Sequence, residues 1–283
     1  MNISNIVISI NDESKLGATL YSPPKLNGAI MLAPATGIRR KFYHQFALNL
    51  AENGWGVITY DNNGIGDSLK GKINESNISL QQWGELDMPN VLNVLKANFP
   101  ETKYHLIGHS AGGQLVGLMY NCTSFSSMFN VACSSGSIPN MKFPFRWRAK
   151  FFMNWFIPLN NILFGYTNTQ WLKMGEPLPK NVAQQWSDWC NASGYVKSAF
   201  GKTIHRHWYD LINFPSLWLH AIDDDIAVSE NVDEMMRVYP NSPSKKLTLN
   251  PRDYDLIDIG HMGFFSKSNK KLWVLATDWL EKH

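Results

Sequence analysis

Short apolar runs alternate with longer amphipathic stretches along most of the chain. Four runs have the continuous apolar character of strands buried on both faces: residues 28–33, 55–60, 104–107 and 128–133. Helices are expected after them or between them: residues 39–53, 81–98 and 111–121. Regular alternation of strands and helices predicts a mainly parallel sheet with helices on both faces.

Both ends of the chain extend this pattern. Residues 3–10 and 16–21 alternate between apolar and polar positions around a polar turn at 11–14, which predicts an antiparallel hairpin. Near the C-terminus the strand and helix order resumes: strands at 215–221 and 245–249, helices at 230–239 and 272–281. The sequence therefore predicts an α/β fold with a mostly parallel, eight-stranded sheet.

Residues 138–205 break the alternation. This segment is rich in tryptophan, and its five prolines are expected to divide it into short helices. Between residues 138 and 200 seven Lys or Arg residues stand against two acidic residues, so this part has a net charge of +5. We therefore expect residues 138–205 to be a helical cap inserted above the sheet, and residues 1–137 and 206–283 to form the α/β core.

Composition narrows the classes of function. The chain has 283 residues, 44% hydrophobic and 17% charged, which indicates a globular protein with a large core. A net charge of +3 without a long basic run argues against a nucleic-acid partner. Neither a secretory signal nor an apolar stretch long enough for stable membrane insertion is visible. Three cysteines without metal-type spacing fit a reducing compartment, and we expect a cytoplasmic protein.

The main candidate chemistry lies in residues 108–112, which read GHSAG and follow the apolar run 104–107. A Gly-x-Ser-x-Gly motif between a strand and a helix is typical of a nucleophile elbow, a sharp turn that presents the serine hydroxyl above the sheet edge. The chain folds back on itself there, so the residues two before and two after Ser110 must be small. Gly108 and Gly112 meet that need.

A serine hydroxyl needs a base to take its proton, and histidine suits this task because its ordinary pKa lies near 6.5. His261 follows the last predicted strand, and Gly260 and Gly263 let its loop fold tightly and expose the ring. His109 is the rival because it neighbours Ser110. Adjacent residues in a tight elbow point in different directions, so we expect His261 to be the base.

A buried carboxylate should then fix the tautomer of the histidine. Asp223, Asp224 and Asp225 directly follow the strand at 215–221, and at most one of them can point at His261. The sequence favours Asp224, with Asp225 and Asp223 as open alternatives. The interval from Asp224 to His261 leaves room for one helix and one strand.

Acyl transfer also needs hydrogen-bond donors for the oxyanion. The backbone N–H of Ala111, directly after the serine, is one candidate. The second should come from the loop after the strand at 28–33, where Ala35 or Thr36 is the candidate. No metal site is expected, because His205 and His207 have no third ligand type near them.

Four segments together resemble the α/β-hydrolase superfamily: residues 108–112, 61–68, 223–225 and 260–261. Within it they look most like bacterial predicted hydrolases near the serine aminopeptidase and monoacylglycerol-lipase-like branch. The resemblance implies hydrolysis of esters, thioesters or amides without a metal or other cofactor. The chain departs from many relatives at Ala33 and Pro34, where those relatives have His-Gly, which leaves the second oxyanion donor open.

We therefore expect a serine hydrolase that cleaves a small-molecule acyl ester or thioester through an acyl-serine intermediate. An acyltransferase with the same intermediate and a non-catalytic ligand-binding member of the fold are the alternatives. The aromatic and basic residues at 143–156 also suit docking on a lipid surface, although a cap helix that packs on the core is favoured. A homodimer stays open.

Overall fold

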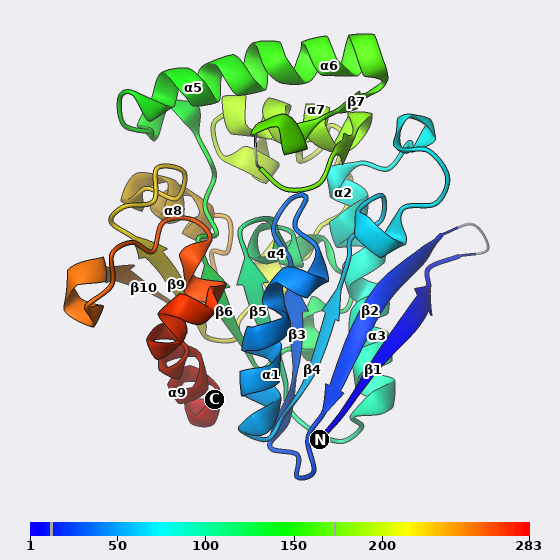
Figure 1. Ribbon diagram of the computed structural model, residues 1–283, viewed down its shortest axis with the longest axis vertical. Coiled ribbons are helices and arrows are strands. Elements are labelled where there is room, and N and C mark those ends of the chain that lie inside the picture. The colour runs from blue at the N-terminus through cyan, green and yellow to red at the C-terminus, as the bar shows by residue number, and fades with distance from the viewer. Residues whose placement is uncertain (12–13, 173) are drawn as a thin grey trace.

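The computed structural model describes residues 1–11, 14–172 and 174–283. Three residues lie outside this description. They are Asp12 and Glu13 of the predicted hairpin turn, and Lys173, one of the seven basic residues counted between residues 138 and 200. An eight-stranded sheet with the order β1-β2-β4-β3-β5-β6-β9-β10 forms the centre (Figure 1). Its strands are β1 (Asn2–Ser9), β2 (Lys15–Ser22), β3 (Gly28–Ala33), β4 (Trp55–Tyr60), β5 (Tyr104–His109), β6 (Ser127–Val131), β9 (Ser216–Ala221) and β10 (Ser244–Leu249).

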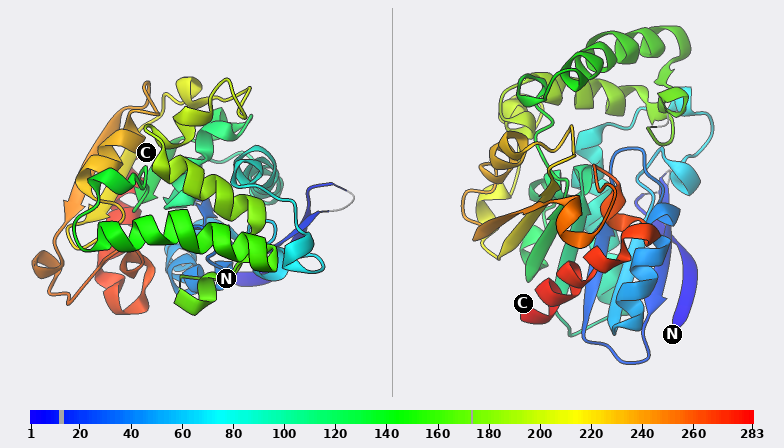
Figure 2. Two further views of the ribbon diagram at one scale, coloured as in Figure 1. Left: turned by 90° about the horizontal axis from the view of Figure 1, so that it is seen from above. Right: turned by 60° about the vertical axis from the view of Figure 1, so that its left-hand side comes forward.

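This sheet is antiparallel at one edge and parallel elsewhere. β1 pairs with β2 and β2 with β4 in antiparallel register, whereas the other neighbouring strands run parallel. All residues of β3 and β4 are buried, as expected for strands with a helix layer on each face. α1 (His44–Glu52) and α9 (Val274–Lys282) cover one face and α3 (Met88–Asn98) the other (Figure 1, Figure 2). The predicted α/β fold with a mostly parallel, eight-stranded sheet is confirmed.

The helix after the elbow is shorter than predicted. The predicted helix over residues 111–121 is only α4 (Ala111–Gln114), followed by a 3₁₀ turn at Val116–Leu118. A Cβ atom at Gly117 would lie 2.2 Å from ring carbons of Tyr209. The Tyr209 hydroxyl donates to the carbonyl oxygen of Gln114 at 2.7 Å, in place of a helical N–H. Because the glycines of this segment also disfavour the α-helix, α4 ends early.

The chain leaves the sheet after β6 and returns to it at β9. The elements between them are α5 (Phe145–Phe151), a π turn (Phe152–Phe156), α6 (Ile157–Phe164), β7 (Tyr166–Thr167), β8 (Leu178–Pro179) and α7 (Lys180–Asn191). In Figure 1, α5, α6 and α7 lie above the carboxyl ends of the parallel strands. Two further helices complete the fold, α2 (Leu80–Gln82) before α3 and α8 (Ser229–Met236) after β9.

α5, the π turn and α6 follow one another without interruption, so one helix runs over residues 145–164. The prediction that prolines divide this segment into short helices is wrong at Pro158. A π turn changes the hydrogen-bond pairing just before the proline, which accommodates a residue without an N–H. Residues 143–156, expected to pack on the core, do so on one side only, because Trp147 and Trp155 are exposed. No helix of the described residues is both long and apolar enough to cross a membrane.

A buried ion pair fixes the loop after β4. Asp61 is 1% exposed and accepts hydrogen bonds from both the backbone N–H and the guanidinium of Arg40. The same guanidinium pairs with Asp67 at 2.7 Å. Because Arg40 stands just before α1, these contacts join the loop after β4 to the start of α1. They give residues 61–68 a structural role.

Asp87 anchors the same loop from the π turn Trp83–Asp87. Its Oδ2 accepts a hydrogen bond from the N–H of Asn63 at 2.7 Å. Burial raises the pKa of the Asp87 carboxyl to about 8. The folded protein therefore keeps this group protonated at a pH where the unfolded chain, with an ordinary pKa of about 4, has already lost the proton.

Replacing Asp87 tests this assignment. Since the folded state binds the extra proton, the wild-type free energy of unfolding should fall as pH rises from about 4 to about 8. Asp87→Asn cannot ionise and keeps an acceptor for Asn63, so its stability should fall less over that range. Urea unfolding at several pH values measures this, with the exposed Asp278→Asn as the control. Equal pH dependence in wild type and Asp87→Asn would contradict the assignment.

Candidate active site

The backbone at Ser110 is strained. Ser110 has φ 49° and ψ −114° and lies between the end of β5 and the start of α4. A Cβ atom at Gly108 would lie 2.6 Å from the Cα of Gly113, and one at Gly112 would lie 2.1 Å from the carbonyl oxygen of Ala33. The chain can therefore make this turn only with glycine at both positions. Ser110 itself is partly exposed, whereas its neighbours in the elbow are buried.

His261 and Asp224 are hydrogen bonded, with 2.8 Å between Nδ1 and Oδ2. The Asp224 side chain is fully buried, and the His261 side chain is 18% exposed. Asp224 Oδ1 accepts the N–H groups of Ile226 and Ala227 at 2.8 and 2.9 Å. Burial raises the pKa of the Asp224 carboxyl, but the adjacent His261 and these N–H groups outweigh burial and hold the pKa below its ordinary value. Asp224 is thus a carboxylate that orients the ring of His261.

The other two acids of this loop differ in their surroundings. Asp223 accepts hydrogen bonds from the N–H groups of Ile259 and Gly260 at 2.9 and 3.1 Å. It therefore holds the backbone just before His261 rather than the ring. Asp225 is exposed. Of the three acids, Asp224 is the one in contact with the ring.

A buried chain of hydrogen bonds joins the elbow to the loop of His261. Nε2–H of His109 donates to the carbonyl oxygen of His261 at 2.9 Å. Nδ1 of His109 is then an acceptor, and the hydroxyl of Tyr43 donates to it at 2.8 Å. Burial lowers the pKa of His109 to about 3, so its ring is neutral at physiological pH. Because His109 precedes Ser110, this contact holds His261 beside the elbow.

Sequence reasoning missed Tyr43. Its ring is fully buried and packs edge to face against Phe265, as an ordinary core aromatic would. The sequence signal for a further role is the hydroxyl group, because a buried tyrosine hydroxyl needs a hydrogen-bond partner. No periodic pattern in the sequence identifies that partner.

The structure corrects one candidate oxyanion donor. The N–H of Ala35 donates to the Tyr43 hydroxyl at 2.9 Å and is therefore not free to bind a substrate oxygen. Among the described residues, no acceptor is found for the N–H of Ala111 or of Thr36. These two groups stay as the candidates. Through this hydrogen bond, Ala35 becomes the first member of the hydrogen-bond chain that runs through Tyr43 and His109.

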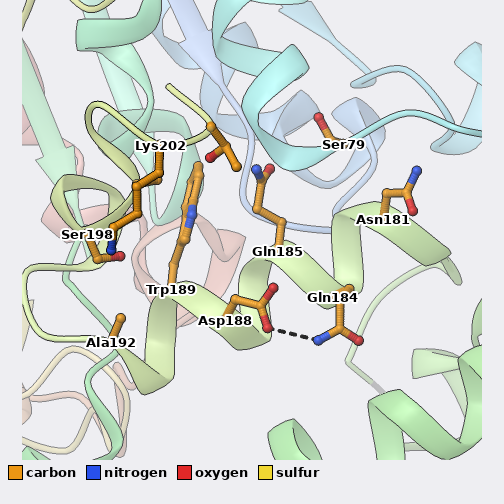
Figure 3. Close-up of a pocket in the computed structure, with 11 residues that line it drawn as sticks. Ser79, Asn181, Gln184, Gln185, Asp188, Trp189, Ala192, Ser198 and Lys202 are labelled. Carbon is orange, nitrogen blue, oxygen red and sulfur yellow. Dashed lines mark hydrogen bonds between the residues drawn. The ribbon is translucent and has the colours of Figure 1, made fainter. Parts of the chain in front are cut away.

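Three surface cavities lie apart from these residues. A cavity of about 480 Å³ is bordered by α7 and the segment after it, with Asn181, Gln185, Trp189 and Lys202 among its lining residues (Figure 3). Two others have volumes of about 600 and 310 Å³. None of the three is lined by Ser110 or His261. Among the residues described, no cluster of His, Cys, Asp or Glu could hold a metal ion.

Comparison with known proteins identifies a protein family that matches this chain. The family described as serine aminopeptidase, S33, matches residues 24–254. No curated protein sequence matches the chain. Among solved structures, a soluble variant of monoglyceride lipase from Saccharomyces cerevisiae in complex with a substrate analogue has a TM-score of 0.73 and 14% sequence identity, over 100% of this chain and 98% of that one.

Two esterases show the same likeness. The Pyrococcus furiosus esterase has a TM-score of 0.64 and 14% identity over 99% of this chain and 91% of that one. The carboxyl esterase of Bacillus coagulans, in complex with glycerol, has a TM-score of 0.63 and 13% identity over 99% of each chain. At such identities the solved structures establish a shared fold.

The role of Tyr43 is open to a direct test. Tyr43→Phe leaves the buried N–H of Ala35 and Nδ1 of His109 without their shared partner, so we expect a loss of about 1–3 kcal/mol in the free energy of unfolding. Urea unfolding measures it. The control is Tyr166→Phe, since the Tyr166 hydroxyl is not hydrogen bonded within the described residues. A Tyr43→Phe protein as stable as wild type would show that the hydroxyl does not hold this network.

Proposed function

The chain belongs to the serine aminopeptidase S33 family of α/β-hydrolases, and we propose that it is a serine hydrolase that cleaves acyl esters or thioesters. The observation that carries the proposal is the hydrogen bond between His261 and the buried Asp224, in a loop that is tied through His109 to the elbow. Ser110 is the nucleophile, His261 the base and Asp224 the acid that orients it.

The first half-reaction forms an acyl-serine. Ser110 Oγ attacks the carbonyl carbon of the substrate while Nε2 of His261 takes the hydroxyl proton. The N–H groups of Ala111 and Thr36 donate to the negative oxygen of the tetrahedral intermediate, and one good donor lowers the barrier by about 3–4 kcal/mol. The bond from carbon to the leaving oxygen or sulfur then breaks, and His261 returns the proton to the leaving group.

The second half-reaction restores the enzyme. A water molecule attacks the acyl carbon, and His261 takes a proton from it. The carboxylic acid leaves, and Ser110 regains its proton from His261. Asp224 stays ionised throughout, because its pKa is held below the ordinary value. Its negative charge stabilises the imidazolium that forms in each step.

Two observations bear on the substrate class. The similar structures include a monoglyceride lipase and two esterases, which favours esters over amides for this chain. We also propose that residues 138–205 act as a cap above the site and residues 1–137 and 206–283 as the α/β core. Phe152, Met153 and Ile157 of this cap are buried and apolar, and we propose that the cap favours an apolar acyl group.

Replacing the nucleophile is the first test. Ser110→Ala should lose labelling by a fluorophosphonate probe and at least about 10³-fold of the kcat for p-nitrophenyl ester hydrolysis. Ser193→Ala is the matched control, because Ser193 is exposed and lies outside the site. Probe labelling of Ser110→Ala at the wild-type level would exclude Ser110 as the nucleophile.

The two acids give the second test. Asp224→Asn should lower kcat by about 10⁴-fold, since an amide no longer fixes the required tautomer of His261. Asp223→Asn, whose carboxyl contacts only backbone N–H groups, should lower kcat far less. Steady-state kinetics of both variants measure the difference, and equal losses would contradict the assignment.

Product analysis with alcohols and amines added separates hydrolysis from acyl transfer, because a transferase forms acylated acceptor faster than free acid.

A further inference from the structure

The helix over residues 145–164 has two different faces. Phe152, Met153 and Ile157 are buried and belong to the same apolar core as the sheet. The hydroxyl of Ser187 on α7 donates to the carbonyl oxygen of Met153 at 2.8 Å. This side is therefore fixed on the rest of the protein. The other side forms the outer surface of the molecule, nearest the viewer in the view from above (Figure 2).

The outer side is apolar as well. Of the 21 large apolar residues exposed in the described part of the chain, ten lie between residues 143 and 172. Trp147, Trp155 and Trp171 are 65%, 70% and 63% exposed. We call the ten residues the outer face: Phe143, Trp147, Phe151, Trp155, Leu159, Ile162, Leu163, Phe164, Trp171 and Leu172.

The outer face is a continuous stripe. Trp147, Phe151, Trp155 and Leu159 recur every four residues, which puts them on one side of the helix. The ring of Trp171 packs against Phe164 with 5.7 Å between centroids and continues the stripe beyond the helix end. A helix of this length spans about 30 Å. Apolar surface of this extent usually marks a binding surface.

Basic side chains border the stripe. Lys142, Arg146, Arg148 and Lys150 are exposed, and none forms an ion pair with a described residue. The sequence has no Asp or Glu between residues 138 and 175. Nζ of Lys150 lies 5.8 Å from the ring centroid of Trp147, so cationic and aromatic groups stand side by side. The surface that complements this face must be apolar in depth and negative at its boundary.

We propose that the outer face docks the protein on an anionic lipid bilayer, with the helix in the plane of the membrane interface. Tryptophan and phenylalanine enter the boundary between headgroups and acyl chains. Lysine and arginine reach lipid phosphates while their stems stay on apolar surface. The aromatic stripe with basic borders supplies both contacts along one exposed helix.

A second copy of the chain fits this face less well. A two-fold contact brings the same patch of both copies together. The four basic residues of one copy would then face those of the other, and this segment has no acidic residue to offset the repulsion. An anionic bilayer instead attracts every one of the four.

Vesicle flotation of the full chain tests the proposal. The probes are vesicles of phosphatidylcholine alone and vesicles of phosphatidylcholine with phosphatidylglycerol. We expect binding to the anionic vesicles to be at least about tenfold tighter than to the neutral ones, because each basic residue near the surface adds attraction. Added salt should weaken it.

Two double variants separate the apolar and the charged contributions. Trp147→Ser with Trp155→Ser should weaken binding at least about tenfold, since two large apolar anchors are lost. Arg148→Gln with Lys150→Gln should remove most of the preference for anionic vesicles. Ile257→Ser is the matched control, because Ile257 is apolar and 100% exposed but lies outside the outer face. Circular dichroism and urea unfolding check that each variant is folded, independently of the proposed activity.

Several results would overturn the proposal. One is wild-type protein that does not float with the anionic vesicles, and another is equal flotation of wild type and the double tryptophan variant. A third is a wild-type dimer that the tryptophan variant converts to a monomer without any vesicle binding, which assigns the face to a contact between copies. Ester hydrolysis is measured in the absence of vesicles, so failure of the proposed activity and failure of docking are distinguishable.

Discussion

The geometry of the site depends on how closely the first turn of α4 approaches the sheet. A side chain at Gly112 would meet the carbonyl group of Ala33 in β3, and one at Gly113 would come within 2.3 Å of the amide oxygen of Asn130 in β6. Because both positions lack a Cβ, α4 can begin directly against two parallel strands. Ser110 then has to take a positive φ, a strain of about 1–3 kcal/mol that the surrounding packing holds in place. The result is a partly exposed hydroxyl at the carboxyl edge of the sheet.

A second constraint acts on the position of His261. The hydrogen-bond chain from Ala35 through Tyr43 and His109 ends on the backbone of His261, while Asp224 holds the ring of the same residue. Backbone and ring of His261 are thus fixed by different partners. Since burial keeps His109 neutral, the first of these contacts does not change with protonation near neutral pH. The geometry is therefore maintained by groups outside the Ser, His and Asp set.

Much of the fold could be predicted from local patterns, because the faces of strands and helices repeat at short intervals. β3 and β4 begin and end at the predicted residues, 28–33 and 55–60. The site is harder. Asp223 and Asp224 are adjacent and chemically identical, and only the turn after β9 decides which one meets His261. The Tyr43 hydroxyl joins the N–H of Ala35, eight positions earlier, to Nδ1 of His109, and no periodicity reveals such a pairing. The catalytic roles themselves stay predictions.

The helix over residues 145–164 shows where hydrophobicity alone fails. It is apolar on nearly every side, so its pattern does not reveal which side meets the core, and the expectation of core packing is right for Phe152 but wrong for Trp155. Charge supplies the missing orientation. Burying an unpaired cation costs several kcal/mol, so Arg146 and Lys150 must face outward. Trp147 and Phe151, one position further along the helix, are exposed beside them. The charges that keep this face in contact with water are the same charges that suit it to a negative interface.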